Sequence, residues 1–150
     1  MAAAVFVAAR VGAAETNEAI VLDSKDAVID AAGGKAQYES KEDRRCVGYW
    51  ESTNVVVRWT TTVPAKGAWR VAVEYAAQLP DPGPEVEVVA GNQRASGILR
   101  PTGDWGKFVL ADLGPILFRK AGSIEVTVKT ISLCRGHGIN LRGVRLMREP

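Results

Sequence analysis

The chain has 150 residues, 47% hydrophobic and 24% charged, which is the balance of a globular protein and excludes a disordered one. This length supports one domain with a proper core and is hardly enough for two. The 19 Lys and Arg residues against 17 Asp and Glu residues leave a net charge of +2, and no basic block stands apart, so we expect no nucleic-acid partner.

The first segment, residues 1–14, is small and apolar (MAAAVFVAARVGAA) and closes on Ala13-Ala14 before Glu15, which resembles the cleavage site of an export signal. Arg10 interrupts the run and no basic region precedes it, so a short amphipathic helix or a disordered tail is the alternative. We therefore expect a leader or flexible tail over 1–18 and one domain over 19–150. If this segment is an export signal, the protein is expected to be secreted or periplasmic. No run reaches the roughly 18 apolar residues of a membrane span, so we expect no membrane partner.

From Ala19 onward, the hydrophobic pattern has a period of two, which is typical of half-buried antiparallel strands. Turn residues separate the apolar runs at spacings of roughly ten residues, and we expect about eight to ten strands. The clearest runs are 54–62 (NVVVRWTTT), 69–75 (WRVAVEY), 85–89 (EVEVV), 124–128 (IEVTV) and 140–147 (NLRGVRLM). The fold class predicted is all-β, an antiparallel β-sandwich.

Pro64 and Gly67 lie between two of these runs and predict a hairpin that joins Val55–Val63 to Ala68–Ala76. Trp59 and Trp69 share the parity of the apolar positions around them, so both are expected in the core. A polar loop rich in Gly and Arg, Ser132–Gly138, precedes the last strand, and loops at one rim of a rigid sandwich commonly carry binding groups.

The ordered motifs GYW, VVVRW, VPAKGAWRVAVEYA, TGDWGKFVLADLGPILFRKAG, SIEVTV and GINLRGVRL, from about Ala19 to Met147, resemble the β-jelly-roll carbohydrate-binding modules of family 6 and their relatives. They are similar as well to the galactose-binding-like domains appended to secreted fucosidases and sulfatases. The resemblance implies a jelly roll, and a sugar held by the tryptophan of the TG-x-W motif, an early aromatic residue and the asparagine that opens the last strand.

In this sequence, these positions are Trp105, Tyr49 or Trp50, and Asn140, with Tyr49 preferred to Trp50. An aromatic ring packs on the C–H face of a pyranose, and an amide both donates to and accepts from its hydroxyls. Each residue also has a structural alternative. Trp105 and Tyr49 could pack into the end of the sandwich, and Asn140 could satisfy loop backbone groups.

Family 6 modules often hold a structural calcium through a Glu-x-Glu pair, but residues 21–26 read VLDSKD, and the last strand has no Asp. We therefore expect no metal and no cofactor. Arg44-Arg45 and Arg135-Gly136-His137 are unusual for a neutral-sugar site and favour an anionic saccharide, because guanidinium groups suit carboxylates and sulfates. The mixed-sign run 41–45 is alternatively a solvated loop.

Cys46 precedes Gly48-Tyr49-Trp50, and Cys134 precedes Asn140, so the implied site places both cysteines at one rim. A disulfide between them would close a long loop and contribute about 4–5 kcal/mol in the chain-entropy model. It would require an oxidising compartment. Two independent buried thiols are the alternative.

A non-catalytic carbohydrate-binding module is therefore the leading functional hypothesis. A structural or protein-interaction domain on the same scaffold is the alternative, because a fold does not determine a function. An enzyme is not expected. Any catalytic triad would need the single histidine, His137, and neither paired glycosidase carboxylates nor a cofactor motif can be placed.

Overall fold

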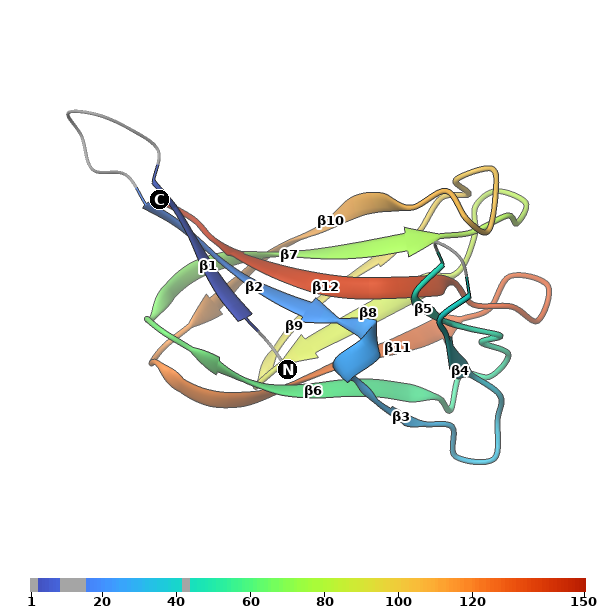
Figure 1. Cartoon of the computed structure of the whole chain (residues 1–150), viewed down its shortest axis with the longest axis horizontal. Helices are drawn as coiled ribbons and strands as arrows, with labels where there is room; N and C mark the ends of the chain where they lie inside the picture. Colours follow the sequence, from blue (N-terminus) through green and yellow to red (C-terminus); the bar gives the residue numbers. More distant parts are fainter. Residues whose placement is uncertain (1–2, 9–15, 42–43) are drawn as a thin grey trace.

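The computed structural model describes residues 3–8, 16–41 and 44–150. In this part of the chain, two antiparallel sheets pack face to face, which confirms the predicted β-sandwich (Figure 1). The first sheet consists of β1 (Ala3–Ala8), β2 (Thr16–Asp23), β4 (Gln37–Glu39), β5 (Cys46–Gly48), β7 (Gly67–Ala76), β10 (Val109–Phe118) and β12 (Asn140–Arg148). The second sheet consists of β3 (Val28–Asp30), β6 (Val56–Val63), β8 (Glu85–Ala90), β9 (Gln93–Ile98) and β11 (Gly122–Ser132).

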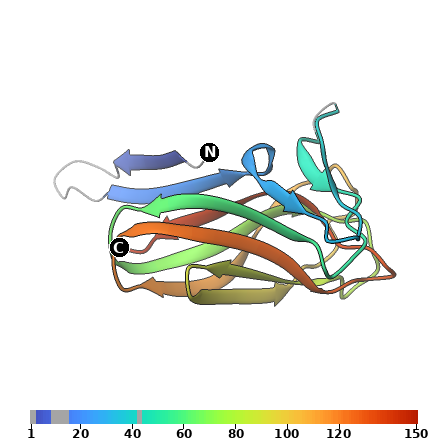
Figure 2. The same cartoon turned by 90° about the horizontal axis from the view of Figure 1, so that it is seen from below.

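The strand β12 lies at the centre of the first sheet. β7 pairs with it along one edge from Asn140 to Arg148, and β10 follows beyond β7. On the other edge, β2 pairs with its C-terminal part and β5 with Leu141 near its beginning. In the second sheet, the order is β3-β6-β11-β8-β9. Figure 2 looks onto the face of the second sheet, with the strands of the first sheet behind it.

The core lies between these layers and follows the period-two pattern. The side chains of Val57, Trp59 and Val63 on β6 are buried, and Trp69 and Val71 on β7 are buried opposite them. β-Branched and aromatic side chains favour such a pleated, one-sided environment. The expectation that Trp59 and Trp69 belong to the core is confirmed.

The predicted hairpin between Val55–Val63 and Ala68–Ala76 is wrong. Strands form at both places, but β6 pairs with β3 and β11 in one sheet, whereas β7 pairs with β10 and β12 in the other. Residues Pro64–Lys66 reverse the chain as expected and carry it from one layer to the other. Turn residues determine the reversal, and the distant strands β10 and β11 determine which sheet each strand joins.

Twelve strands occur in the described part, more than the eight to ten expected, because β3, β4 and β5 are three-residue strands. Residues 3–8 form β1, which pairs antiparallel with β2, and not an amphipathic helix. The strand β2 begins at Thr16, so the boundary expected after residue 18 falls inside a strand. The expected cleavage point at Ala13-Ala14 lies outside the described residues. Within the described residues, no helix has the length and hydropathy needed to span a membrane.

Candidate functional site

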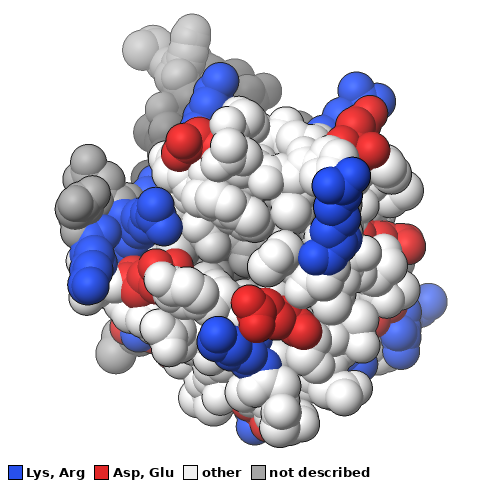
Figure 3. All heavy atoms as spheres, turned by 90° about the vertical axis from the view of Figure 1, so that its right-hand side faces the viewer, with Lys and Arg blue, Asp and Glu red and all other residues white. Residues whose placement is uncertain are grey.

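A cavity of about 290 Å³ is lined by residues of the β4–β5, β5–β6, β9–β10 and β11–β12 loops and their flanking strands. These loops lie at one end of the sandwich (Figure 1). The cavity walls combine residues from three distant parts of the chain. They are Glu39, Arg44, Tyr49, Trp50, Glu51, Trp105, His137, Gly138, Ile139 and Asn140. The structure thus brings together all four ligand-binding residues expected from the sequence. Figure 3 shows this end of the molecule, where charged side chains of both signs are interspersed and form no patch of one sign.

Trp105 is held at the cavity by the loop after β9. The Thr102 backbone N–H donates to the Ala77 carbonyl at 2.8 Å, and the Thr102 hydroxyl accepts from the Ala77 N–H at 3.1 Å. The Asp104 carboxylate accepts from the Gly106 N–H at 2.7 Å, which closes the turn around Trp105. The sequence signal Thr-Gly-Asp therefore builds a turn anchored on the end of β7. The indole is partly buried and packs against the core on one side.

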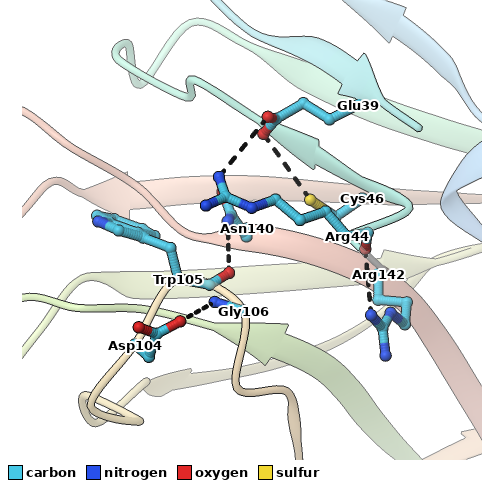
Figure 4. A network of polar contacts seen from close by, with 8 residues as sticks. All are labelled: Glu39, Arg44, Cys46, Asp104, Trp105, Gly106, Asn140 and Arg142. Carbon is cyan, nitrogen blue, oxygen red and sulfur yellow. Dashed lines mark hydrogen bonds and ion pairs between the residues drawn. The ribbon is translucent and has the colours of Figure 1, made fainter. Parts of the chain in front are cut away.

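Asn140 opens β12 and is 5% exposed. Its Nδ2 donates to the Trp105 carbonyl oxygen at 2.8 Å (Figure 4). Because a carbonyl oxygen can only accept, the amide nitrogen must face Trp105, and Oδ1 must face the other way. Asn140 therefore satisfies a loop backbone group, the structural alternative above, and also lines the cavity.

Tyr49 and Trp50 take opposite roles. Tyr49 has a left-handed backbone (φ 52°), uncommon for a residue other than glycine, and its side chain is 50% exposed at the cavity. Trp50 is 2% exposed, and its Nε1 donates to the Ser52 carbonyl at 3.1 Å. Trp50 forms the wall behind the cavity, so of the two early aromatic residues only Tyr49 presents much of its ring to a ligand.

The structure adds a carboxylate that the sequence did not indicate. Glu39 on β4 has a side chain that is only 12% exposed, and its Oε1 lies 3.9 Å from Arg44 Nη1. Its Oε2 lies 4.0 Å from the Cys46 sulfur (Figure 4). No motif marks Glu39, because it reaches the cavity only through the pairing of β4 with β5.

A second acidic residue, Glu51, and His137 lie together on the cavity wall. Glu51 Oε1 is 4.0 Å from His137 Nδ1, and Glu51 Oε2 is 3.8 Å from Lys35 Nζ. The His137 ring meets the Trp105 ring edge-on, with centroids 6.4 Å apart. Of the basic residues that suggested an anionic ligand, Arg44 and His137 line the cavity, and Arg45 and Arg135 do not. Among the described residues, no group of three or more His, Cys, Asp or Glu could hold a metal ion.

The expected bridge between Cys46 and Cys134 is absent, because both cysteines are free thiols. Their loops do meet, since the Gly138 N–H donates to the Trp50 carbonyl at 2.7 Å. The side chains, however, diverge. Cys46 is buried on β5 beside Glu39, and the Cys134 sulfur lies 3.5 Å from the Pro80 carbonyl oxygen. Proximity of two loops does not bring their sulfur atoms within bonding distance.

We expect thiol alkylation to distinguish these cysteines. Burial, and secondly the nearby Glu39 carboxylate, raise the pKa of Cys46 to about 12, so its reactive thiolate is scarce at neutral pH. A mild alkylating reagent should label Cys134 in the folded protein and both residues in denaturant, as mass spectrometry would show. Equal labelling of Cys46 and Cys134 in the folded state would contradict the burial of Cys46. If neither cysteine were labelled in denaturant, the two would be joined by a disulfide after all.

Several solved structures have a fold similar to that of this chain. A family 35 carbohydrate-binding module from Clostridium thermocellum superposes with a TM-score of 0.68 at 14% identity, over 85% of this chain and 96% of that one. The C-terminal family 6 module of a marine laminarinase from Zobellia galactanivorans gives a TM-score of 0.70 at 15% identity, over 87% and 99%.

A third similar structure is a module from Cellvibrio mixtus lichenase 5A in complex with cellotriose, with a TM-score of 0.64, 17% identity and coverage of 87% and 96%. No protein-family model and no curated protein matches the sequence. At these identities the likeness establishes the fold. The chain has the jelly-roll fold of family 6 and family 35 carbohydrate-binding modules, as its sequence resemblance implied.

Proposed function

We propose that this chain is a non-catalytic carbohydrate-binding module that holds a saccharide in the cavity between Tyr49 and Trp105. One observation carries this proposal. Tyr49, Trp105 and Asn140 come from three distant parts of the sequence and line one cavity. The fold is that of carbohydrate-binding modules, one of which is in complex with cellotriose.

The chemistry of the cavity suits a sugar ring. Tyr49 and Trp105 offer rigid apolar area for the C–H face of a pyranose. Asn140, Glu39 and Arg44 offer acceptors and donors for its hydroxyls. The volume of about 290 Å³ lies at the lower end of the roughly 300–1,000 Å³ of small-molecule sites, so the cavity suits a short saccharide segment or a chain end.

The charge of the saccharide is a separate part of the proposal. The anionic class expected from the basic residues would bind through Arg44, which lines the cavity opposite two carboxylates, Glu39 and Glu51. Because the Glu39 carboxylate is more deeply buried than its partner Arg44 and would repel an acidic sugar, we propose that the ligand needs no negative charge. A glycan array that includes uronic-acid and sulfated chains tests this point directly.

Location and partners follow from the same proposal. We propose that the protein is secreted or periplasmic, where polysaccharides occur, and that the sandwich from β2 to β12 acts as one unit. Cell fractionation tests the location. A protein partner bound by the same rim is the alternative function, and it would be favoured if the array detected no saccharide.

We expect Trp105→Ala to weaken binding of the best array ligand by at least about tenfold, which corresponds to about 1.4 kcal/mol, because the apolar platform is removed. Isothermal titration calorimetry measures this loss, and circular dichroism checks that the fold remains. Leu117→Ala removes an exposed apolar side chain from β10 and is the matched control, with unchanged affinity expected. Equal affinity of Trp105→Ala and the unmodified protein would overturn the proposed site.

A further inference from the structure

Glu39 lies in the cavity with an incompletely satisfied carboxylate. Its side chain is 12% exposed, and its contacts are the Arg44 guanidinium at 3.9 Å and the Cys46 thiol at 4.0 Å. Neither distance is that of a good N–H···O hydrogen bond, and the described part of the chain supplies no shorter one. A largely buried carboxylate without close donors is costly, so this position favours a donor from whatever fills the cavity.

Asn140 provides a second hydrogen-bond acceptor near Glu39. Its Nδ2 donates to the Trp105 carbonyl, so its Oδ1 faces Gly48. A Cβ added to Gly48 would clash with Glu39 Oε2 and would lie 3.0 Å from Asn140 Oδ1. Glu39 Oε2 already fills the side-chain space at Gly48, and Asn140 Oδ1 borders that space, so the two acceptors are neighbours on the cavity wall. A ligand group that reaches both must donate to both oxygens.

The two carboxylates at the cavity each have a cationic partner. Glu39 lies 3.9 Å from Arg44, and Glu51 lies 3.8 Å from Lys35, so these four charges balance. The carboxylate and the guanidinium also differ in depth, because the Glu39 side chain is 12% exposed and the Arg44 side chain is 45% exposed. A desolvated charge acts more strongly than a solvated one, so Glu39 dominates the potential inside the cavity.

We propose that the cavity prefers a saccharide with a protonated amino group, of the 2-amino-2-deoxy class, whose ammonium donates to Glu39 and to Asn140 Oδ1. This inference rests on the proposed saccharide-binding function and specifies its ligand. An ammonium has three N–H donors and a positive charge, so it can satisfy both acceptors and compensate the buried carboxylate. A hydroxyl has one donor, and a uronate adds a second negative charge beside Glu39.

The experiment compares three β-1,4-linked oligosaccharides of equal length that differ at one substituent. They are oligomers of glucosamine, of N-acetylglucosamine and of glucose, titrated calorimetrically below neutral pH and at two salt concentrations. We expect the glucosamine oligomer to bind about five- to tenfold more tightly than the other two, because a charge-assisted hydrogen bond is about twice as strong as a neutral one. Added salt should reduce that preference.

Two variants distinguish a direct contact with Glu39 from an effect of the overall charge of the protein. Glu39→Gln keeps the shape and removes the negative charge, and it should abolish the preference, so that the glucosamine oligomer binds no more tightly than the glucose oligomer. Glu87→Gln removes an equal charge on β8, where Glu87 pairs with Arg94, and the preference should survive. Equal affinities for all three oligomers, with binding lost in Trp105→Ala, would overturn this inference and leave the proposed function standing. Binding of no saccharide would overturn both.

Discussion

Replacing Trp59 by alanine is expected to lower the free energy of unfolding by about 3–5 kcal/mol, the range for removing a large aromatic side chain from a packed core. Trp59 lies on β6 in the second sheet, and its ring is 4% exposed. Its Nε1 donates to the Asp23 carbonyl oxygen at 2.8 Å, at the end of β2 in the first sheet. The substitution therefore removes core volume and a bond that ties the two layers together. Urea unfolding measures the loss.

Trp69 provides the matched comparison. It is also buried, on β7, but within the described residues its Nε1 has no hydrogen-bond partner. Changing either tryptophan to phenylalanine removes similar volume, whereas only Trp59→Phe breaks a hydrogen bond. We expect Trp59→Phe to be the less stable variant by about 1 kcal/mol. Equal stability of the two variants, or the reverse order, would contradict the role given to the Asp23 contact.

The two core tryptophans show what the sequence makes predictable. Alternation around Trp59 and Trp69 is a local pattern, and one face of a strand must be buried in any sandwich, so their burial follows without knowledge of the partner strands. The strands that carry them were also predicted within a few residues. Their pairing was not, because the partners β10 and β11 lie far along the chain and local turn residues carry no information about them.

Some residues of the candidate site were likewise predictable from the sequence, and others were not. Trp105 and Asn140 were expected there from the resemblance, and the structure joins them by the bond from Asn140 to the Trp105 carbonyl. Glu39 has no sequence signal, because its place depends on the register of a three-residue strand against β5. The disulfide prediction failed for a related reason. Loop proximity was correct, but side-chain directions depend on local backbone geometry that spacing does not determine.

Local backbone geometry also distinguishes Tyr49 from Trp50, two aromatic residues that are adjacent in the sequence. The left-handed backbone at Tyr49 allows one ring to remain exposed while the next is buried. A residue other than glycine in this conformation is strained, and such strain persists where the surroundings enforce it, commonly at binding sites. The pair therefore combines a surface for the ligand with a support behind it.

Trp50→Ala is accordingly expected to lower the free energy of unfolding by about 3–5 kcal/mol and to weaken saccharide binding as well. Built on Gly138, a Cβ would lie 3.0 Å from Trp50 Cγ, and the Gly138 N–H donates to the Trp50 carbonyl at 2.7 Å. Removing the indole would leave a void directly behind the segment from Gly138 to Asn140 that lines the cavity. Denaturant unfolding and titration calorimetry measure the two effects on the same preparation.

The variant Trp50→Phe separates support from contact. Phenylalanine keeps most of the volume behind Gly138 and loses only the bond from Nε1 to the Ser52 carbonyl, so we expect a cost of about 1–2 kcal/mol and nearly unchanged affinity. If Trp50 instead touched the ligand, Trp50→Ala would reduce affinity and leave the unfolding free energy unaltered. That result would reassign Trp50 from the wall to the binding surface. Loss of stability and of affinity together, with recovery of both in Trp50→Phe, is the pattern that a buried support requires.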